Sequence, residues 1–196
     1  MNASSNVFAQ LTSKSSLTHH DVVMRNCLRA GDLGRIIQLH GELYGKEQGW
    51  NSVFEAYVAD GLARFVLHND PHRDRIWIAE DAQTGQFLGC IGVVGIPDDK
   101  TTSQLRWFLL HPDARGQGLG RRLLETALSF CRQDESQPSS SSSSASSKTV
   151  FLWTVAQLPI AGHLYRSVGF KVTEEHTHSE WGTLVTEQRL ELKLKN

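Results

Sequence analysis

A glycine-rich turn with an excess of positive charge is the part of the sequence best suited to chemistry. Residues 115–120 read RGQGLG, and Arg121 and Arg122 follow at the start of an amphipathic pattern typical of a helix. Glycines at three of five positions expose successive backbone N–H groups, and a helix N-terminus adds partial positive charge. Cations there cost stability unless an anion binds. The pattern therefore predicts a phosphate site; the alternative is a flexible loop with solvated arginines, in which Arg121 pairs with Glu125.

The turn does not match the two commonest phosphate-binding motifs. A P-loop requires GxxxxGK[ST], and no lysine follows these glycines. A dinucleotide fingerprint requires a final glycine where Arg121 or Leu123 stands. The sequence therefore indicates another phosphate ligand at a strand-to-helix turn late in the chain.

The hydrophobic patterns on both sides predict the elements that position this turn. Strands are expected at residues 22–28, 75–80, 86–94, 104–110 and 150–155, followed by two late strands, and helices at 33–44, 52–66, 118–133 and 159–168. Asn51 or Ser52 is suited to cap the second helix. The run 104–110 is apolar on both faces, so we expect it to be central. Strands interleaved with helices, with a hairpin turn at 81–85, indicate a mixed-sheet α/β domain.

The composition predicts one globular domain with two polar segments. The chain has 196 residues, 39% of them hydrophobic, and a formal net charge of -1, which gives no general case for nucleic-acid or membrane partners. Residues 1–20 are expected to form a disordered tail, and residues 21–196 a single domain. The serine-rich stretch 134–148 is expected to be an inserted surface loop.

The cysteines and the lack of targeting signals predict a cytoplasmic protein. Cys27, Cys90 and Cys131 are far apart and outside any CxxC spacing, so we expect buried or partly buried free thiols in a reducing compartment. No apolar run approaches the ~18 residues of a membrane span, and the first twenty residues lack a secretory h-region.

Two sequence blocks together resemble the GNAT N-acetyltransferase superfamily. Residues 115–120 fit its acetyl-CoA-binding segment, written [QR]xxGx[GA], and residues 164–170, LYRSVGF, are similar to its LYxxxGF segment. Residues 40–50, HGELYGKEQGW, further resemble a GNAT subgroup that is also found fused to winged-helix MarR-type regulators. The resemblance covers about residues 22–193. It implies an α/β (α+β) fold with a mixed, mostly antiparallel central sheet flanked by about four helices.

The resemblance implies that acetyl-CoA is the acyl donor. Backbone amides of the glycine turn would bind the pyrophosphate, and the preceding strand would hold the pantetheine arm. The implied cofactor-binding residues are Phe108, Leu109, Leu110, Arg115, Gly116, Gln117, Gly118, Leu119, Gly120, Arg121 and Arg122. Tyr165 would be the catalytic general acid for the leaving thiolate. Without the LYxxxGF motif, we would expect it to be an aromatic residue of the core.

Two departures from the family pattern leave the general base unassigned. Leu158 stands where many GNAT enzymes have an asparagine, and the central strand offers Gln104 instead of a glutamate. The remaining candidates are Glu47, Glu80 and His111. The reaction could also rely on water, since direct transfer chiefly needs a positioned, deprotonated amine.

The first two helices are expected to form one wall of the substrate cleft. The candidate acceptor-binding residues are Tyr44, Glu47, Trp50 and Trp107. A carboxylate framed by aromatic rings suits a cationic amine, whereas the alternative is an aromatic pair that packs helix against helix. His176 and His178 lie at i, i+2, but the sequence offers no third ligand, so no metal site is expected.

These features predict an acetyl-CoA-dependent N-acetyltransferase that acts by direct transfer on a primary amine of a small molecule or peptide. We expect a cytoplasmic monomer or homodimer without nucleic-acid or membrane partners. One alternative is a catalytically weak acyl-CoA-binding or sensing module, which the missing glutamate and asparagine favour. A second is an interaction domain that uses the serine-rich loop.

Overall fold

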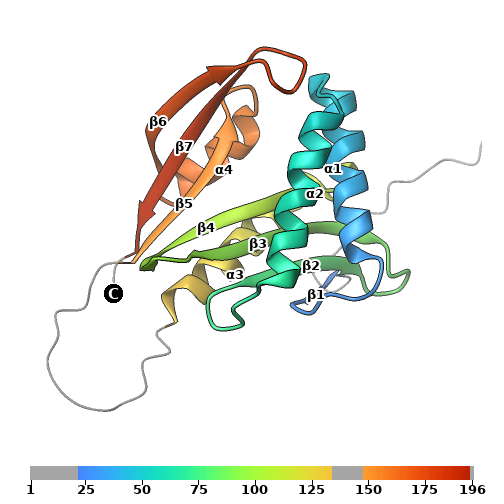
Figure 1. Ribbon diagram of the computed structural model, residues 1–196. Coiled ribbons are helices and arrows are strands. Elements are labelled where there is room, and N and C mark those ends of the chain that lie inside the picture. The colour runs from blue at the N-terminus through green and yellow to red at the C-terminus, as the bar shows by residue number, and fades with distance from the viewer. Residues whose placement is uncertain (1–21, 134–147, 195–196) are drawn as a thin grey trace, which may run out of the picture.

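A seven-stranded sheet forms the centre of the protein (Figure 1). The computed structural model describes residues 22–133 and 148–194. The strands are β1 (Val22–Arg25), β2 (Arg75–Asp81), β3 (Phe87–Ile96), β4 (Asp99–Leu110), β5 (Thr149–Val155), β6 (Lys171–His178) and β7 (Val185–Lys193). Their order in the sheet is β1-β2-β3-β4-β5-β7-β6, and only the β4–β5 pair is parallel. The mixed, mostly antiparallel fold and the central place of β4 are therefore confirmed.

Helices cover both faces of the sheet. They are α1 (Asp32–Gln48), α2 (Ser52–Leu67), α3 (Leu119–Arg132) and α4 (Pro159–Ser167), with a short 3-10 turn, η1 (Pro112–Ala114). Helices α1 and α2 pack on one face with their own hydrophobic core, and α3 and α4 pack on the other (Figure 1). The Asn51 side chain caps α2 by accepting the Val53 N–H, as expected.

The first strand is shorter than predicted. It ends at Arg25 instead of Leu28, and at this point the Arg25 guanidinium turns inward to two partly buried acids. It contacts the Asp32 carboxylate at 2.7 Å and the Glu80 carboxylate at 2.8 Å. Cys27 follows this strand, and its side chain is exposed. The prediction that its thiol is buried or partly buried is therefore wrong.

The parallel pair β4–β5 separates halfway along its length, which opens the sheet. Pairing runs only from Thr102 with Thr149 to Leu105 with Leu152, and beyond this point the two strands diverge (Figure 1). A bulge in β4 accompanies the divergence: Trp107 has a φ of 49°, in the left-handed region that bulky residues rarely adopt. The opening places the ends of β4 and β5 on opposite sides of a gap.

The predicted tail at residues 1–20 and almost all of the serine-rich stretch 134–148 lie outside the described residues. The two ends of that stretch adjoin, because the Lys148 Nζ donates to the Gln133 carbonyl at 2.8 Å. Among the helices that the structure describes, none is long and apolar enough to cross a membrane.

Candidate active site

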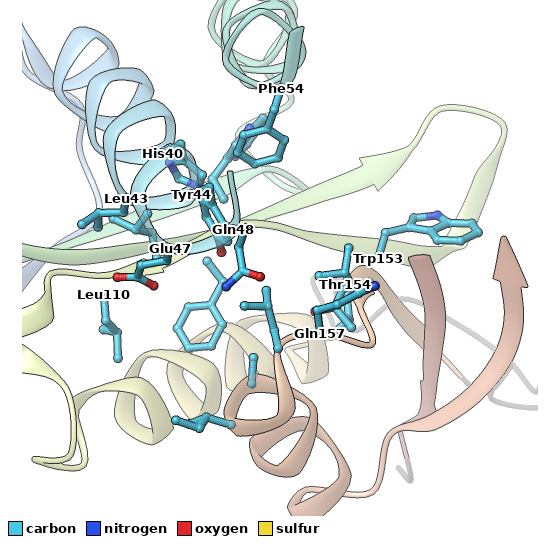
Figure 2. Close-up of a pocket in the computed structure, with 18 of the residues that line it drawn as sticks. His40, Leu43, Tyr44, Glu47, Gln48, Phe54, Leu110, Trp153, Thr154 and Gln157 are labelled. Atoms are coloured by element: carbon cyan, nitrogen blue, oxygen red, sulfur yellow. The ribbon is translucent and has the colours of Figure 1, made fainter. Parts of the chain in front are cut away.

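A cleft of about 570 Å³ occupies the gap between β4 and β5. Its walls come from α1 and α2 on one side, and from β5, the start of α4 and the β6–β7 hairpin on the other. Figure 2 shows Tyr44, Glu47 and Gln48 of α1 across the gap from Thr154 at the end of β5 and Gln157 just beyond it. Since the lining is mostly apolar, its few polar groups decide what the cleft can bind.

The floor of the cleft is an open strand edge. Phe108, Leu109 and Leu110 of β4 all line it. Within the described residues, β5 pairs with β4 only as far as Leu105, so the last part of this edge offers backbone polar groups without a strand partner. Such an edge can accept an extended ligand in the manner of an added strand.

The glycine turn forms an open helix N-terminus beside this edge. Gly116 and Gly118 have φ angles of 76° and 80°, so both need the left-handed conformation that glycine allows. Gly118 is the N-cap of α3 and provides no side-chain cap, and the first turn contains no acidic residue. A Cβ at Gly116 would meet no atom within 4 Å, whereas one at Gly120 would meet Leu110 Cδ1 at 3.1 Å. The turn is therefore tightly packed on its helix side and open at its tip.

Two of the three arginines stay close to this helix start. Arg115 lines the cleft, and its Nη1 lies 2.8 Å from Glu47 Oε1. Arg121 donates to Ser167 Oγ at 3.0 Å and approaches Glu125 at 3.6 Å, so the pair with Glu125 exists as a long contact. Both guanidinium groups remain about half exposed and available to an anion.

The side chains of three other predicted cofactor residues are engaged within the protein. Arg122 turns away toward β1, where its Nη1 lies 3.5 Å from the Val22 carbonyl oxygen. The Leu119 side chain is buried in the core, so only its backbone could face a ligand. Gln117 donates to the Asp113 carbonyl at 2.7 Å.

Tyr165 is both a core aromatic and part of the cleft lining. Its ring packs against Phe108 and Phe170 at 6.0 Å each, and the residue is 6% exposed. Burial and the neighbouring Tyr44 phenol raise the pKa of Tyr165 well above its usual value. Burial also raises the pKa of Tyr44 to about 12. Both phenols therefore remain protonated at neutral pH.

The predicted acceptor-binding residues line the cleft but also hold it together. Tyr44 stacks on Trp50 at 4.8 Å, and Trp50 packs against Phe54 and Trp181 at 4.5 Å each. These four rings, which we call the aromatic cluster, join α1 and α2 to the β6–β7 turn. These aromatic rings therefore do pack helix against helix, and all four also line the cleft. Trp107 lines the cleft beside the bulge and is 7% exposed.

The three candidate bases lie in different places. Glu47 lines the cleft but pairs with Arg115. Glu80 belongs to the Arg25 cluster, and His111 caps η1 by accepting the Asp113 N–H; neither lines the cleft. Gln104, where the family pattern would place a glutamate, does line it.

One carboxylate that lines the cleft, Glu187, was not among the residues predicted from the sequence. Glu187 of β7 lines the cleft, and its carboxylate lies 3.3 Å from the Nε2 atom of His178 on β6. His176 stacks on His178 at 5.7 Å. Across residues 22–133 and 148–194, no group of three or more His, Cys, Asp or Glu side chains is arranged to hold a metal ion. The contact between His178 and Glu187 depends on the register of two paired strands, and no local sequence pattern predicts that register.

Parts of this chain resemble known proteins in sequence. A family model described as an acetyltransferase (GNAT) domain matches residues 72–172. Human N-acetyltransferase 8B is 31% identical over 113 residues, a stretch that covers 56% of this chain and only 44% of that protein.

Two solved structures illustrate the likeness of fold. A GNAT-family protein from Desulfovibrio desulfuricans, described as a putative acetyltransferase, superposes with a TM-score of 0.65 at 14% identity, covering 88% of this chain and 98% of the other. Spermidine N-acetyltransferase from Vibrio cholerae, solved with CoA and spermine, gives a TM-score of 0.61 at 20% identity, covering 89% of this chain and 96% of the other.

Proposed function

Because the chain belongs to the GNAT acetyltransferase family, we propose that it is an acetyl-CoA-dependent N-acetyltransferase. Its acceptor is a primary amine of a small molecule or peptide, and transfer is direct. The observation that carries the proposal is the uncapped N-terminus of α3, which stands beside an open edge of β4 at one end of a cleft.

The residues present fit the cofactor. Acetyl-CoA supplies an acetyl group activated as a thioester. Backbone N–H groups of the turn between Arg115 and Arg121 would hold the pyrophosphate, because the left-handed glycines leave this turn open and the helix dipole attracts anions. The edge of β4 at residues 108–110 would hold the pantetheine arm. Arg115 and Arg121 add positive charge at the same place.

The protonated phenol of Tyr165 would serve as the general acid. It lines the cleft near Phe108, so it would lie beside the arm that runs along β4. Because its raised pKa makes this phenol a weaker acid than a thiol, we expect proton transfer to accompany C–S bond cleavage.

The lining of the cleft supports a cationic acceptor with an apolar part. The aromatic cluster and Trp107 offer π faces, and Glu47 and Glu187 supply carboxylates. We expect the enzyme to act in the cytoplasm as a monomer or homodimer.

A second candidate function is acyl-CoA binding without efficient catalysis. Gln104 and Leu158 support it, since both line the cleft where many GNAT enzymes carry a glutamate and an asparagine. This module would bind acetyl-CoA through the same glycine turn.

Calorimetry and a thiol-release assay separate these possibilities. We expect acetyl-CoA to bind, and CoA to be released with at least one amine from a panel of tyramine, spermidine and lysine-containing peptides. Binding without release across the panel would favour the sensing module. No binding at high micromolar acetyl-CoA would overturn both.

Replacing Arg121 by glutamate is expected to weaken acetyl-CoA binding by about 10-fold, because an acid would face the pyrophosphate at the helix start. Calorimetry measures the affinity. Arg35→Glu is the matched control, since it changes the net charge equally on an exposed position of α1, on the opposite face of the sheet. Equal affinities for Arg121→Glu and the wild type would remove Arg121 from the site.

A further inference from the structure

The β6–β7 hairpin brings a carboxylate to the cleft that β4 does not provide. Glu187 pairs in the sheet with Val155, the last residue of β5, and both line the cleft. Its side chain is 23% exposed, so the carboxylate is partly withdrawn from water but open on one side. Gln104 of β4 lines the same cleft and can neither accept nor release a proton at neutral pH.

Hydrogen bonds determine the tautomer of the neighbouring histidine. The backbone N–H of Glu180 donates to Nδ1 of His178 at 3.2 Å, so Nδ1 carries no proton. The proton of the neutral ring is therefore on Nε2, which points to Glu187 Oε2 at 3.3 Å. Trp181 packs edge-on against the ring at 4.9 Å. The ring can thus hold the carboxylate by one oxygen without cancelling its charge, and Oε1 is not used by this contact.

The surroundings favour a carboxylate that can take up a proton. Burial raises the pKa of Glu187, although His178 and His176 oppose this, and Glu180 adds a negative charge nearby. The other titratable groups in the lining are His40, Tyr44, Glu47, Tyr57, Arg106, Arg115 and Tyr165. Arg106 lies over the Tyr57 ring at 5.2 Å. The carboxylate of Glu47 is already engaged by Arg115 at 2.8 Å, which leaves Glu187 as the cleft carboxylate without an arginine partner among the described residues.

We propose that Glu187, positioned by His178, is the general base that deprotonates the acceptor ammonium. This inference rests on the proposed function. One ammonium proton passes to the Glu187 carboxylate, and the freed nitrogen lone pair forms the C–N bond with the thioester carbonyl carbon. The C–S bond breaks, Tyr165 protonates the departing sulfur, and the second nitrogen proton replaces the one that Tyr165 gave. Glu187 then releases its proton to water.

The decisive variant is Glu187→Gln, which keeps the shape of the side chain and removes its basicity. With the panel amine that the wild type uses best, we expect kcat/KM at pH 7 to fall by about 100-fold, while calorimetry finds acetyl-CoA affinity unchanged. The deficit should shrink as the pH approaches the amine's own pKa of about 10, because the amine then deprotonates in water. Glu175→Gln is the control: Glu175 lies on the same hairpin, is exposed and bonds to Gln188 outside the cleft lining. It should retain the wild-type rate.

A wild-type kcat/KM in Glu187→Gln would overturn the proposal. So would a deficit that stays constant with pH, since this would mean that Glu187 only binds the substrate or supports the hairpin.

The positioning role of His178 has a readout that needs no substrate. In His178→Ala the carboxyl of Glu187 loses an N–H donor, so its pKa, followed by ¹³C NMR titration, should rise, and the acid limb of the kcat/KM profile should move to higher pH. His178→Gln keeps an N–H donor, so it should return the pKa of Glu187 and the acid limb of the kcat/KM profile toward their wild-type values. An unchanged Glu187 pKa in His178→Ala would remove this role.

Different results would overturn the proposed function and the role of Glu187. A wild-type protein that neither binds acetyl-CoA nor releases CoA would overturn the proposed function and the base with it. A wild-type protein that turns over normally beside an equally active Glu187→Gln variant would overturn only the assignment of Glu187.

Discussion

A Tyr165→Phe enzyme is expected to turn over about 100-fold more slowly than the wild type while binding acetyl-CoA with the same affinity. The substitution removes one hydroxyl group and leaves the aromatic ring, which packs against Phe108 and Phe170. Because the phenol stays protonated through the neutral pH range, its loss removes a proton donor and no charge. A thiol-release assay gives kcat, and calorimetry gives the affinity.

The control for this experiment disturbs the same core without removing a phenol. Phe170 is 2% exposed and contacts Tyr165, so Phe170→Leu should lower the free energy of unfolding while changing kcat much less than Tyr165→Phe does. Equal rates for Tyr165→Phe and the wild type would mean that another group or water protonates the thiolate.

Replacing Arg25 by methionine is expected to lower the free energy of unfolding by about 3 kcal/mol, measured by urea denaturation. The guanidinium is 7% exposed and contacts two carboxylates, Asp32 at 12% and Glu80 at 18% exposure. Methionine fills much of the space but leaves both acids partly buried without their cation. Arg29→Met is the matched control: Arg29 is 65% exposed and 3.5 Å from the same Glu80, so its loss should cost under about 1 kcal/mol. Similar losses in both variants would contradict this account.

The same cluster predicts how stability depends on pH. Burial alone would raise the pKa of Asp32, but hydrogen bonds from Arg25 and from the Arg29 backbone hold it below its usual 3.8. The hydrogen bond from Arg25 holds the pKa of Glu80 below 4.5. A carboxylate whose pKa is lower in the folded state stabilises that state above its unfolded pKa, and this stability is lost as the pH falls. The difference between the wild type and Arg25→Met should therefore shrink below about pH 4.5.

Local patterns predicted most of the fold, because they depend on neighbours in the chain. The apolar face of α3, the Asn51 cap and the proline at the start of α4 each follow from a few adjacent residues. The glycine turn belongs to the same class, since its left-handed angles require glycine locally.

The parts that could not be predicted depend on contacts between distant residues. Trp107 adopts a left-handed conformation that its bulky side chain disfavours, so nothing in its own sequence indicated the bulge. The ion pair at the end of β1 joins Arg25 to Glu80, which is 55 residues away in the chain. The contact of His178 with Glu187 depends on the pairing of β7 with β6, a strand whose side chains are mostly exposed.

The placement of the tryptophans suits intrinsic fluorescence as a probe of ligand binding in the cleft. The chain has five tryptophans, and four of them, Trp50, Trp107, Trp153 and Trp181, line the cleft. The fifth, Trp77, packs against Phe130 of α3 on the other face of the sheet. Four of the five tryptophan fluorophores therefore belong to the cleft walls. A Trp77→Phe variant would confine the emission to them, so that the arrival of either substrate could be followed in stopped flow without a label.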